Sequence, residues 1–447
     1  MPQNFLIKNA EIINEDKIFN SDVLVKNGRI EKIAANIQTR EKINEIDANG
    51  QYLIPGFIDD QVHFREPGLT HKAEIQTESK AAVAGGITSF MEMPNTKPPA
   101  LTQKLLEEKY QRAAQVSPAN YSFFMGTSND NYEELMRTDL RKVCGLKIFM
   151  GSSTGNMLVD HSEVLNRIFA NFSGLIATHC EDEQTIKDNT AAYLEKYGED
   201  MPIKYHPEIR DAEACYLSSS KAKALAVKHG TRLHILHIST AREIELFDNK
   251  LALKDKKITS EACTHHLWFS DTDYETKSTH IKWNPAVKSA DDRAAVRAAL
   301  NDNRIDVLAT DHAPHTLAEK SNNYFNAPSG GPLVQHTLSA LFELSEQGIF
   351  SKEKIIEKAC HNPAILFDIE DRGFIREGYK ADLVLVAKDR YTVNRDNLLY
   401  KCGWSPFEGQ EFQYKVQKTF VNGNLVFENG KVNDAVKGER LVFRKRD

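Results

Sequence analysis

The chain has 447 residues, of which 41% are hydrophobic and 27% charged, as is typical of a folded globular protein with a substantial core. Its 57 basic and 63 acidic residues give a formal net charge of -6, which excludes the strongly basic surface of a nucleic-acid-binding protein. No apolar run approaches the roughly 18 residues of a membrane span, and no basic leader precedes an apolar stretch, so we expect neither an anchor nor a secretory signal. Six scattered cysteines without a CxxC pair predict reduced thiols in a cytoplasmic protein.

Both ends of the chain show the same pattern of strand, turn and strand. Asn27-Gly28 separates two β-branched runs near the N-terminus, and Asn422-Gly423 does the same near the C-terminus. Asn-Gly between two such runs predicts a type I′ hairpin. Because a lone hairpin is only marginally stable in water, we predict that residues 1–54 and 367–447 fold together as one small β-domain.

Residues 55–366 alternate short apolar runs with longer helix-like stretches such as 101–114 and 211–230. Eight strand–helix units over about 250 to 300 residues match the size of a (β/α)8 barrel. The predicted fold is therefore α/β, a TIM barrel with an appended β-domain. The eight predicted strands lie at 56–58, 87–91, 121–124, 145–150, 175–177, 233–236, 258–259 and 305–309.

Residues able to bind a metal follow four of these strands. His63, His179 and His237 each follow a different strand, and Asp311 follows the eighth. The C-terminal strand ends of a barrel meet at one mouth, where imidazoles and a carboxylate form a metal site with room for water. Any one histidine could be an ordinary core or surface side chain, but four such groups at four strand ends predict a metal centre.

Lys147 interrupts the apolar run 145–150, where an unpaired lysine is costly to bury. One interpretation is that its side chain points outward and its amine reaches solvent. The other is that the amine, held neutral, has captured carbon dioxide and that the resulting carbamate bridges two cations. Spacing alone leaves both interpretations open.

Six short motifs occur in order along the chain: Ile54-Pro55-Gly56-Phe57-Ile58-Asp59, Val62-His63-Phe64-Arg65-Glu66-Pro67-Gly68, Met93-Pro94-Asn95-Thr96, His179-Cys180-Glu181-Asp182, Asn284-Pro285 and Ala309-Thr310-Asp311-His312-Ala313-Pro314-His315. Together they resemble the motifs of cyclic amidohydrolases, and Arg65-Glu66-Pro67-Gly68 resembles that of dihydroorotases in particular. The resemblance covers nearly the whole chain and implies a (β/α)8 barrel with a composite β-sandwich. It also implies reversible, zinc-dependent hydrolysis of L-dihydroorotate to N-carbamoyl-L-aspartate in pyrimidine synthesis. Residues 145–149 are similar to the corresponding sequence in the branch of the family that uses a carboxylated lysine.

The resemblance implies a role for each candidate residue. Two Zn²⁺ ions, bridged by carboxylated Lys147, would be held by His63, Lys147, His179, His237 and Asp311. Asp311 would also move the proton during catalysis. Substrate would be bound by Arg65, Asn95, Asn284, His315, Ser329 and Gly330. Arg65 can hold a carboxylate in a bidentate fork, whereas Asn95 and Asn284 could be ordinary turn residues and 327–331 a flexible loop.

The first barrel strand departs from the His-x-His pattern of this family, because Gln61 stands where the first histidine is expected. An amide oxygen is a poor zinc ligand beside imidazole, so we expect the ion near Gln61 to be held more weakly. His265 and His266 follow the seventh strand, and we expect them to be a solvated loop pair.

Two other functions remain open. An allantoinase or hydantoinase would share the barrel, the metals and the carboxylated lysine, although Arg65 argues against substrates without a carboxylate. A non-catalytic homologue could be a scaffold for aspartate transcarbamoylase, although the retained Lys147 argues against this. We expect a small-molecule substrate, no nucleic acid and no membrane partner, and a homo-oligomer is compatible with the sequence.

Overall fold

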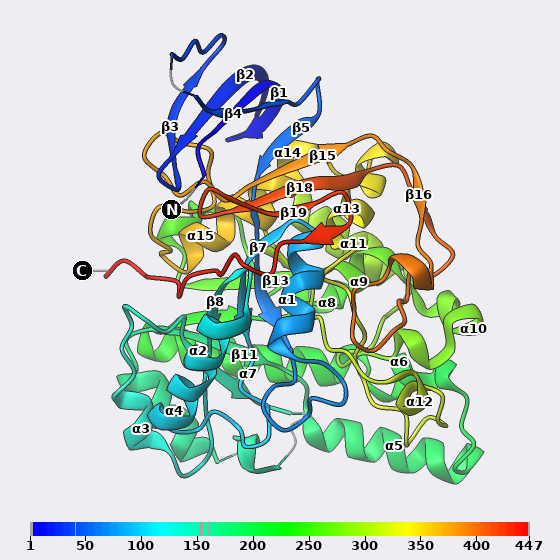
Figure 1. Ribbon diagram of the computed structural model, residues 1–447. Helices are drawn as coiled ribbons and strands as arrows, with labels where there is room; N and C mark the ends of the chain where they lie inside the picture. Colours follow the sequence, from blue (N-terminus) through cyan, green and yellow to red (C-terminus); the bar gives the residue numbers. More distant parts are fainter. Residues whose placement is uncertain (1–2, 41, 152–154, 160, 446–447) are drawn as a thin grey trace.

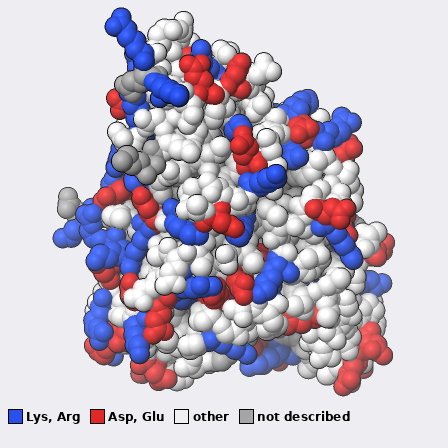
Figure 2. All heavy atoms as spheres, viewed as in Figure 1, with Lys and Arg blue, Asp and Glu red and all other residues white. Residues whose placement is uncertain are grey.

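The structure is a computed structural model that describes residues 3–40, 42–151, 155–159 and 161–445 (Figure 1). A sheet built from both chain ends stands above a region of parallel strands and helices in this view. Within the described ranges, no helix combines the length and hydrophobicity that a bilayer crossing requires. Acidic and basic side chains are interspersed over the face shown in Figure 2. The cysteines are unpaired, as predicted.

The two chain ends contribute to one nine-stranded sheet, in the order β20-β19-β18-β15-β5-β1-β2-β3 with β4 beside β1. Its N-terminal strands are β1 (Phe5–Asn14), β2 (Lys17–Lys26), β3 (Arg29–Ala34), β4 (Asn44–Asp47) and β5 (Tyr52–Pro55). Its C-terminal strands are β15 (Leu383–Ala387), β18 (Lys415–Val421), β19 (Asn424–Glu428) and β20 (Lys431–Val432). The antiparallel pairing of β5 with β15 joins the two ends.

Both Asn-Gly pairs form the predicted hairpin turns. Asn27 and Gly28 connect β2 to β3 with φ of 50° and 79°, and Asn422 and Gly423 connect β18 to β19 with φ of 50° and 71°. Positive φ at both central residues is the signature of a type I′ turn. The two turns pack against each other, because a Cβ on Gly423 would lie 2.6 Å from the Cα of Gly28. A side chain at Gly423 would therefore force the two ends apart.

The nine-stranded sheet is strongly curled. The rings of Phe5 on β1 and Phe420 on β18 are 5.2 Å apart, although β5 and β15 lie between their strands. In a flat sheet, three interstrand spacings would separate them by roughly 14 Å. The sheet therefore folds over a core that includes Ile7, Val23 and Leu383. The expected β-sandwich is one curled sheet, not two separate ones.

All eight predicted barrel strands are present and parallel to their neighbours: β6 (Phe57–Val62), β7 (Ile87–Glu92), β8 (Asn120–Phe123), β10 (Leu146–Phe149), β11 (Leu175–His179), β12 (Arg232–Ile235), β13 (Ile258–Cys263) and β14 (Val307–Ala309). They form two sheets, β6-β7-β8 and β14-β13-β12-β11-β10-β9, instead of one closed ladder. At one seam the chain passes from β8 to β9 (Met125–Gly126), which pairs with β10. At the other seam Val62 and His312 form a single parallel bridge.

Helices connect the parallel strands. The first are α1 (Ile75–Ala84), α2 (Gln103–Val116), α3 (Tyr132–Met136), α4 (Ser162–Asn171), α5 (Glu183–Tyr197), α6 (His206–Ile209), α7 (Ala212–His229) and α8 (Ala241–Ile244). The later ones are α9 (Thr264–Trp268), α10 (Tyr274–Lys277), α11 (Ala290–Asn301), α12 (Leu317–Lys320), α13 (Thr337–Glu346), α14 (Lys352–Ile356) and α15 (Asn362–Leu366). The helical stretches predicted at 101–114 and 211–230 correspond to α2 and α7.

Asp382, just before β15, ties the curled sheet to the parallel strands. Its Oδ1 accepts the backbone N–H of Asn422 at 2.7 Å, and its Oδ2 accepts from Asn120 at 3.2 Å and pairs with Arg372. Both members of the Arg372–Asp382 pair are buried. The hydrogen bond from Asn120 on β8 therefore joins the parallel strands to a buried charge pair beside the curled sheet.

We expect Asp382→Asn to lower the free energy of unfolding by about 3 kcal/mol, because loss of one partner leaves the buried charge of Arg372 uncompensated. Denaturant unfolding followed by circular dichroism measures this difference. Asp371→Asn, which breaks an exposed pair with Arg29, is the matched control and should cost less than about 1 kcal/mol. Equal stability of the unmodified protein and Asp382→Asn would contradict the role given to this pair.

Candidate active site

The four strand-end residues lie in two pairs at the C-terminal ends of the parallel strands. His63 Nε2 lies 3.2 Å from Asp311 Oδ1, and His179 Nδ1 lies 2.9 Å from His237 Nε2. All four residues are buried. Burial lowers the pKa of each of the three histidines, most strongly that of His237. Neutral imidazoles keep a lone pair, which a metal ligand requires.

Lys147 on β10 points inward and lies within electrostatic range of both pairs. Its side chain is only 1% exposed, and its charge helps to lower the pKa of His63, His179 and His237. Burial lowers the pKa of its own amine to about 8. The amine forms no ion pair with any residue that the structure describes. At pH 7 about a tenth of this lysine is therefore neutral, far more than of a lysine with the ordinary pKa.

Neighbouring oxygens fix the tautomers of two of these histidines. His63 Nδ1 lies 2.8 Å from Asn95 Oδ1, and His179 Nε2 lies 3.0 Å from Glu181 Oε2. Because these oxygens accept, both ring nitrogens carry the proton, and His63 Nε2 and His179 Nδ1 are free to bind an ion. His237 Nδ1 is buried without a hydrogen-bond partner among the described residues. The donor set and the outer contacts fit a divalent metal centre.

Glu181 holds His179 as a fully charged carboxylate. Burial raises the pKa of Glu181. Arg210, which pairs with Glu181 Oε2, and His179 outweigh this effect and lower the pKa to about 2. The sequence motif His179-Cys180-Glu181-Asp182 contains Glu181, but no role was predicted for this residue. Its position could have indicated the contact, because the carboxylate follows the histidine by two positions at the end of β11.

Gln61 contacts Asp311, although it replaces the expected histidine. Its Nε2 donates to Asp311 Oδ1 at 3.1 Å, and its Oε1 faces the thiol of Cys263 at 3.6 Å. The amide oxygen, the side-chain atom of Gln61 able to bind a cation, is thus turned toward Cys263.

Four of the residues predicted to bind substrate form a chain of contacts. Arg65 Nη2 lies 2.9 Å from His315 Nε2, and His315 Nε2 lies 2.9 Å from the carbonyl oxygen of Ser329. Ser329 Oγ donates to Asn284 Oδ1 at 2.9 Å. The structure thus brings Arg65, Asn284, His315 and Ser329 to one side of the candidate site.

Gly330 continues this wall. Its φ is 122°, and an added Cβ would lie 2.4 Å from the carbonyl oxygen of Ala313, so only glycine fits. The sixth predicted residue, Asn95, contacts His63 and therefore also belongs to the metal side of the site.

Arg65 is a buried cation without an ion pair. It is 7% exposed, and its Nε donates to the carbonyl oxygen of Pro314 at 3.0 Å. Burial lowers its pKa to about 10. Among the described residues, no Asp or Glu pairs with this guanidinium. An anion that enters the site would therefore meet a positioned positive charge that no carboxylate of the described residues contacts directly.

Three site residues have left-handed backbone conformations, with φ of 68° at Arg65, 41° at His237 and 49° at Asp311. Such conformations cost free energy in non-glycine residues and concentrate at functional sites. All three residues follow the C-terminal ends of parallel strands, β6, β12 and β14.

His265 and His266 are not the solvated pair that the sequence suggested. Both are buried in α9, and the ring of His265 stacks on Trp283 with centroids 4.4 Å apart and an angle of 13°. Burial lowers the pKa of His266 to about 4. The stack depends on Trp283, which is distant in sequence, so inspection of the histidines alone could not reveal it.

Known proteins resemble this chain in sequence and in structure. The sequence profile of the Amidohydrolase family matches residues 52–426. A protein named dihydroorotase from Pyrococcus furiosus is 33% identical over 423 residues, covering 94% of this chain and 91% of that protein. Another from Halobacterium salinarum is 32% identical over 424 residues, covering 92% and 97%. The L-hydantoinase (dihydropyrimidinase) from Arthrobacter aurescens superposes with a TM-score of 0.90 at 26% identity, covering 97% of this chain and 98% of that one.

The chain belongs to the amidohydrolase family, whose fold combines a TIM barrel with a β-domain. Within that family it is a cyclic amidohydrolase, an enzyme that resembles proteins named dihydroorotase in sequence and hydantoinases in structure.

Lys320, the last residue of α12, holds the loop that carries Ser329 and Gly330. Its fully buried Nζ donates to the carbonyl oxygens of Pro328 at 2.8 Å, Gly330 at 2.9 Å and Lys282 at 3.3 Å. Sequence reasoning missed this lysine, because the carbonyls it contacts come together only in the folded loop.

We expect Lys320→Met to accelerate amide hydrogen exchange in residues 323–331 by roughly tenfold or more, because backbone carbonyls lose a buried amine donor. Hydrogen exchange measured by mass spectrometry tests this. Lys354→Met is the matched control, because Lys354 pairs with Glu357 outside the site, and it should leave the loop unchanged. Identical exchange in Lys320→Met and the unmodified protein would show that the loop is rigid without this lysine.

Proposed function

We propose that the protein is a dihydroorotase, which catalyses the reversible, zinc-dependent hydrolysis of L-dihydroorotate to N-carbamoyl-L-aspartate in pyrimidine synthesis. The observation that carries the proposal is Arg65, a buried guanidinium without a carboxylate partner among the described residues. Dihydroorotate has a carboxylate beside its ring, whereas hydantoin and allantoin do not. The relatives named dihydroorotase support the same assignment.

In this proposal, Arg65 binds the substrate carboxylate, and Asn95 and His315 complete its pocket. The contact between Arg65 and His315 already aligns these side chains. Asn284, Ser329 and Gly330 contact the ring, with backbone groups of the loop contributing alongside the side chains. The loop is held by Lys320, so these groups are positioned before substrate arrives.

His63, Lys147, His179, His237 and Asp311 would hold two Zn²⁺ ions, with Lys147 contributing as a carboxylated side chain. The neutral amine of Lys147 attacks carbon dioxide, which forms an N–C bond and releases one proton. The pKa of about 8 supports this step, because only the neutral amine is nucleophilic. When bound, the ions activate a water molecule and polarise the ring carbonyl.

Asp311 is the proton carrier in this proposal. Its Oδ1 accepts from Gln61 and faces His63, whereas Oδ2 has no donor among the described residues. Oδ2 accepts a proton from the attacking water and gives it to the leaving ring nitrogen as the amide C–N bond breaks. In ring closure the same proton moves in the opposite direction, and one water molecule is released.

Hydantoinase is the second candidate, because the hydantoinase from Arthrobacter aurescens superposes over nearly the whole chain. A scaffold without activity does not fit a member of an enzyme family that retains Lys147 between two ligand pairs. A cytoplasmic location, a homo-oligomer and an association with aspartate transcarbamoylase stay predictions from the sequence.

Arg65→Met should lower kcat/KM for dihydroorotate by the equivalent of about 2 to 4 kcal/mol, because a charge-assisted bidentate contact is lost. The same variant should change kcat/KM for hydantoin little, because hydantoin has no carboxylate. Steady-state kinetics with both substrates measures the difference. Arg141→Met, which removes a half-exposed arginine paired with Glu370, should alter neither value. If hydantoin or allantoin is the better substrate of the unmodified protein, the dihydroorotase assignment is wrong.

Because Gln61 stands where the family has a histidine, the two metal positions should differ in affinity. We expect a tightly held ion on the His179–His237 side and a looser ion near His63, which mild chelation removes first. Gln61→His should tighten the looser ion, because imidazole binds zinc better than an amide oxygen does. Competition with a metallochromic chelator gives both affinities for each protein. Two equal affinities that Gln61→His leaves unchanged would show that position 61 does not govern metal binding.

A further inference from the structure

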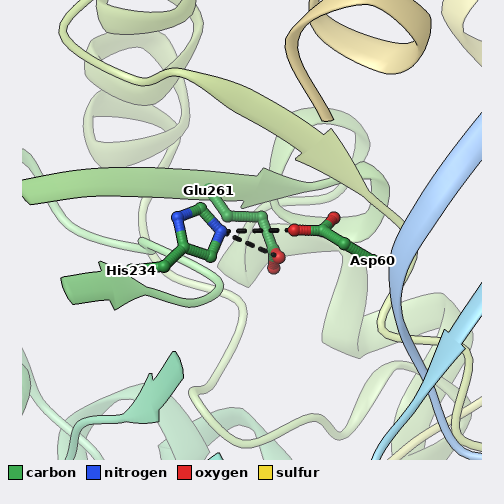
Figure 3. A group of neighbouring side chains, drawn as sticks. All are labelled: Asp60, His234 and Glu261. Carbon is green, nitrogen blue, oxygen red and sulfur yellow. Dashed lines mark ion pairs between the residues drawn. The ribbon is translucent and has the colours of Figure 1, made fainter. Parts of the chain in front are cut away.

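A second group of potential metal ligands lies among the parallel strands. Two of its members, Asp60 and His234, precede the active-site residues His63 and His237 by three positions each. Figure 3 shows Asp60 of β6, His234 of β12 and Glu261 of β13 pointing toward one another. All three are 0% exposed. Among the described residues, this is the only group of three His, Cys, Asp or Glu residues whose ligand atoms all lie within 4.8 Å of one another.

The facing atoms of this triad lack hydrogen-bond partners. Both carboxylate oxygens of Asp60, Glu261 Oε2 and His234 Nε2 are buried and without a hydrogen bond within the described part of the chain. Buried carboxylate oxygens normally accept hydrogen bonds or contact a cation. Asp59, the neighbouring buried acid, shows the contrast, because Thr310 donates to both of its oxygens.

The distances within the triad match those between metal ligands. His234 Nε2 lies 3.3 Å from Asp60 Oδ2 and 3.6 Å from Glu261 Oε2. Charge-assisted hydrogen bonds between such atoms are shorter, about 2.7 to 2.9 Å. Ligands bound at about 2.0 Å to a tetrahedral ion are separated by about 3.3 Å. The triad is therefore more open than a hydrogen-bonded ion pair and has the spacing of a coordination shell.

Outer contacts orient His234 and Glu261 toward the centre of the triad. Thr259 Oγ1 donates to the carbonyl oxygen of Leu233 at 3.2 Å and so accepts from His234 Nδ1 at 2.9 Å. In the neutral ring, Nε2 then keeps the lone pair that faces the two acids. Glu261 Oε1 accepts the backbone N–H of His237 at 3.1 Å, which leaves Oε2 directed at the centre. Such contacts are typical of histidines and carboxylates that bind a metal.

We propose that Asp60, His234 and Glu261 form a structural binding site for one divalent cation of the zinc type, separate from the catalytic ligands. One such ion balances the two carboxylates and leaves no net charge in the dry interior. It also links β6, β12 and β13, and through Glu261 it fixes the backbone of His237. The ion is therefore a support for the catalytic site and takes no part in the reaction.

Without an ion, a proton occupies the same position. Burial lowers the pKa of His234, but the facing carboxylates of Asp60 and Glu261 raise it overall, to about 9. A cation that binds must displace this proton. The proposal and the alternative, a triad that only shares a proton, therefore differ in metal content and in geometry.

Anomalous diffraction from crystals of the unmodified protein equilibrated with Zn²⁺ tests the proposal without any substitution. We expect a peak at the zinc edge about 2.0 to 2.2 Å from Asp60, His234 Nε2 and Glu261. Anomalous peaks at the catalytic metal positions without a peak at the triad would overturn the proposal. The triad would then be an ion pair that shares a proton.

Metal analysis of variants is the second measurement. Asp60→Asn should lose one equivalent of zinc per chain after dialysis, and Asp59→Asn, the matched acid on the same strand, should lose none. His179→Asn should lose catalytic zinc and keep the anomalous peak at the triad. An unchanged zinc content in folded Asp60→Asn, or an equal loss in Asp59→Asn, would contradict the site.

Discussion

The burial of Lys147 among the parallel strands is the constraint on which the active site depends. An ammonium group without a carboxylate partner is unfavourable in the protein interior, and its pKa of about 8 expresses that cost. Carboxylation would convert the side chain from a cation without an ion pair among the described residues into an anion near the His63–Asp311 and His179–His237 pairs. Other features of the site are compatible with a carboxylated Lys147. They are the neutral histidines, the oxygens that fix their tautomers and the left-handed residues at the strand ends.

Much of the architecture could be predicted from local sequence patterns. The eight parallel strands appear where apolar runs end in polar residues, and both Asn-Gly pairs form type I′ turns. These features depend on backbone preferences and on the alternation of apolar and polar residues, which a single sequence contains. The convergence of His63, His179, His237 and Asp311 follows from the same source, because the ends of parallel strands share one edge.

The remaining features depend on contacts between distant residues. Three of these features form only in the folded chain. They are the stack of His265 on Trp283, the hydrogen bonds of Lys320 to backbone carbonyls, and the curling of the sheet that brings Phe5 to Phe420. The pairing of Gln61 with Asp311 is of the same kind, because 250 residues separate them. The lack of an ion pair between Arg65 and any described residue could not be predicted either, since only the structure shows which groups contact the guanidinium.

The most direct test of this account is the chemical state of Lys147 in the metal-loaded protein. A high-resolution crystal structure obtained in the presence of bicarbonate and Zn²⁺ would show it. The account predicts electron density for one carbon dioxide unit attached to Nζ, with an oxygen directed at the His63–Asp311 pair and another at the His179–His237 pair. A bare amine in the fully metal-loaded protein would contradict the account.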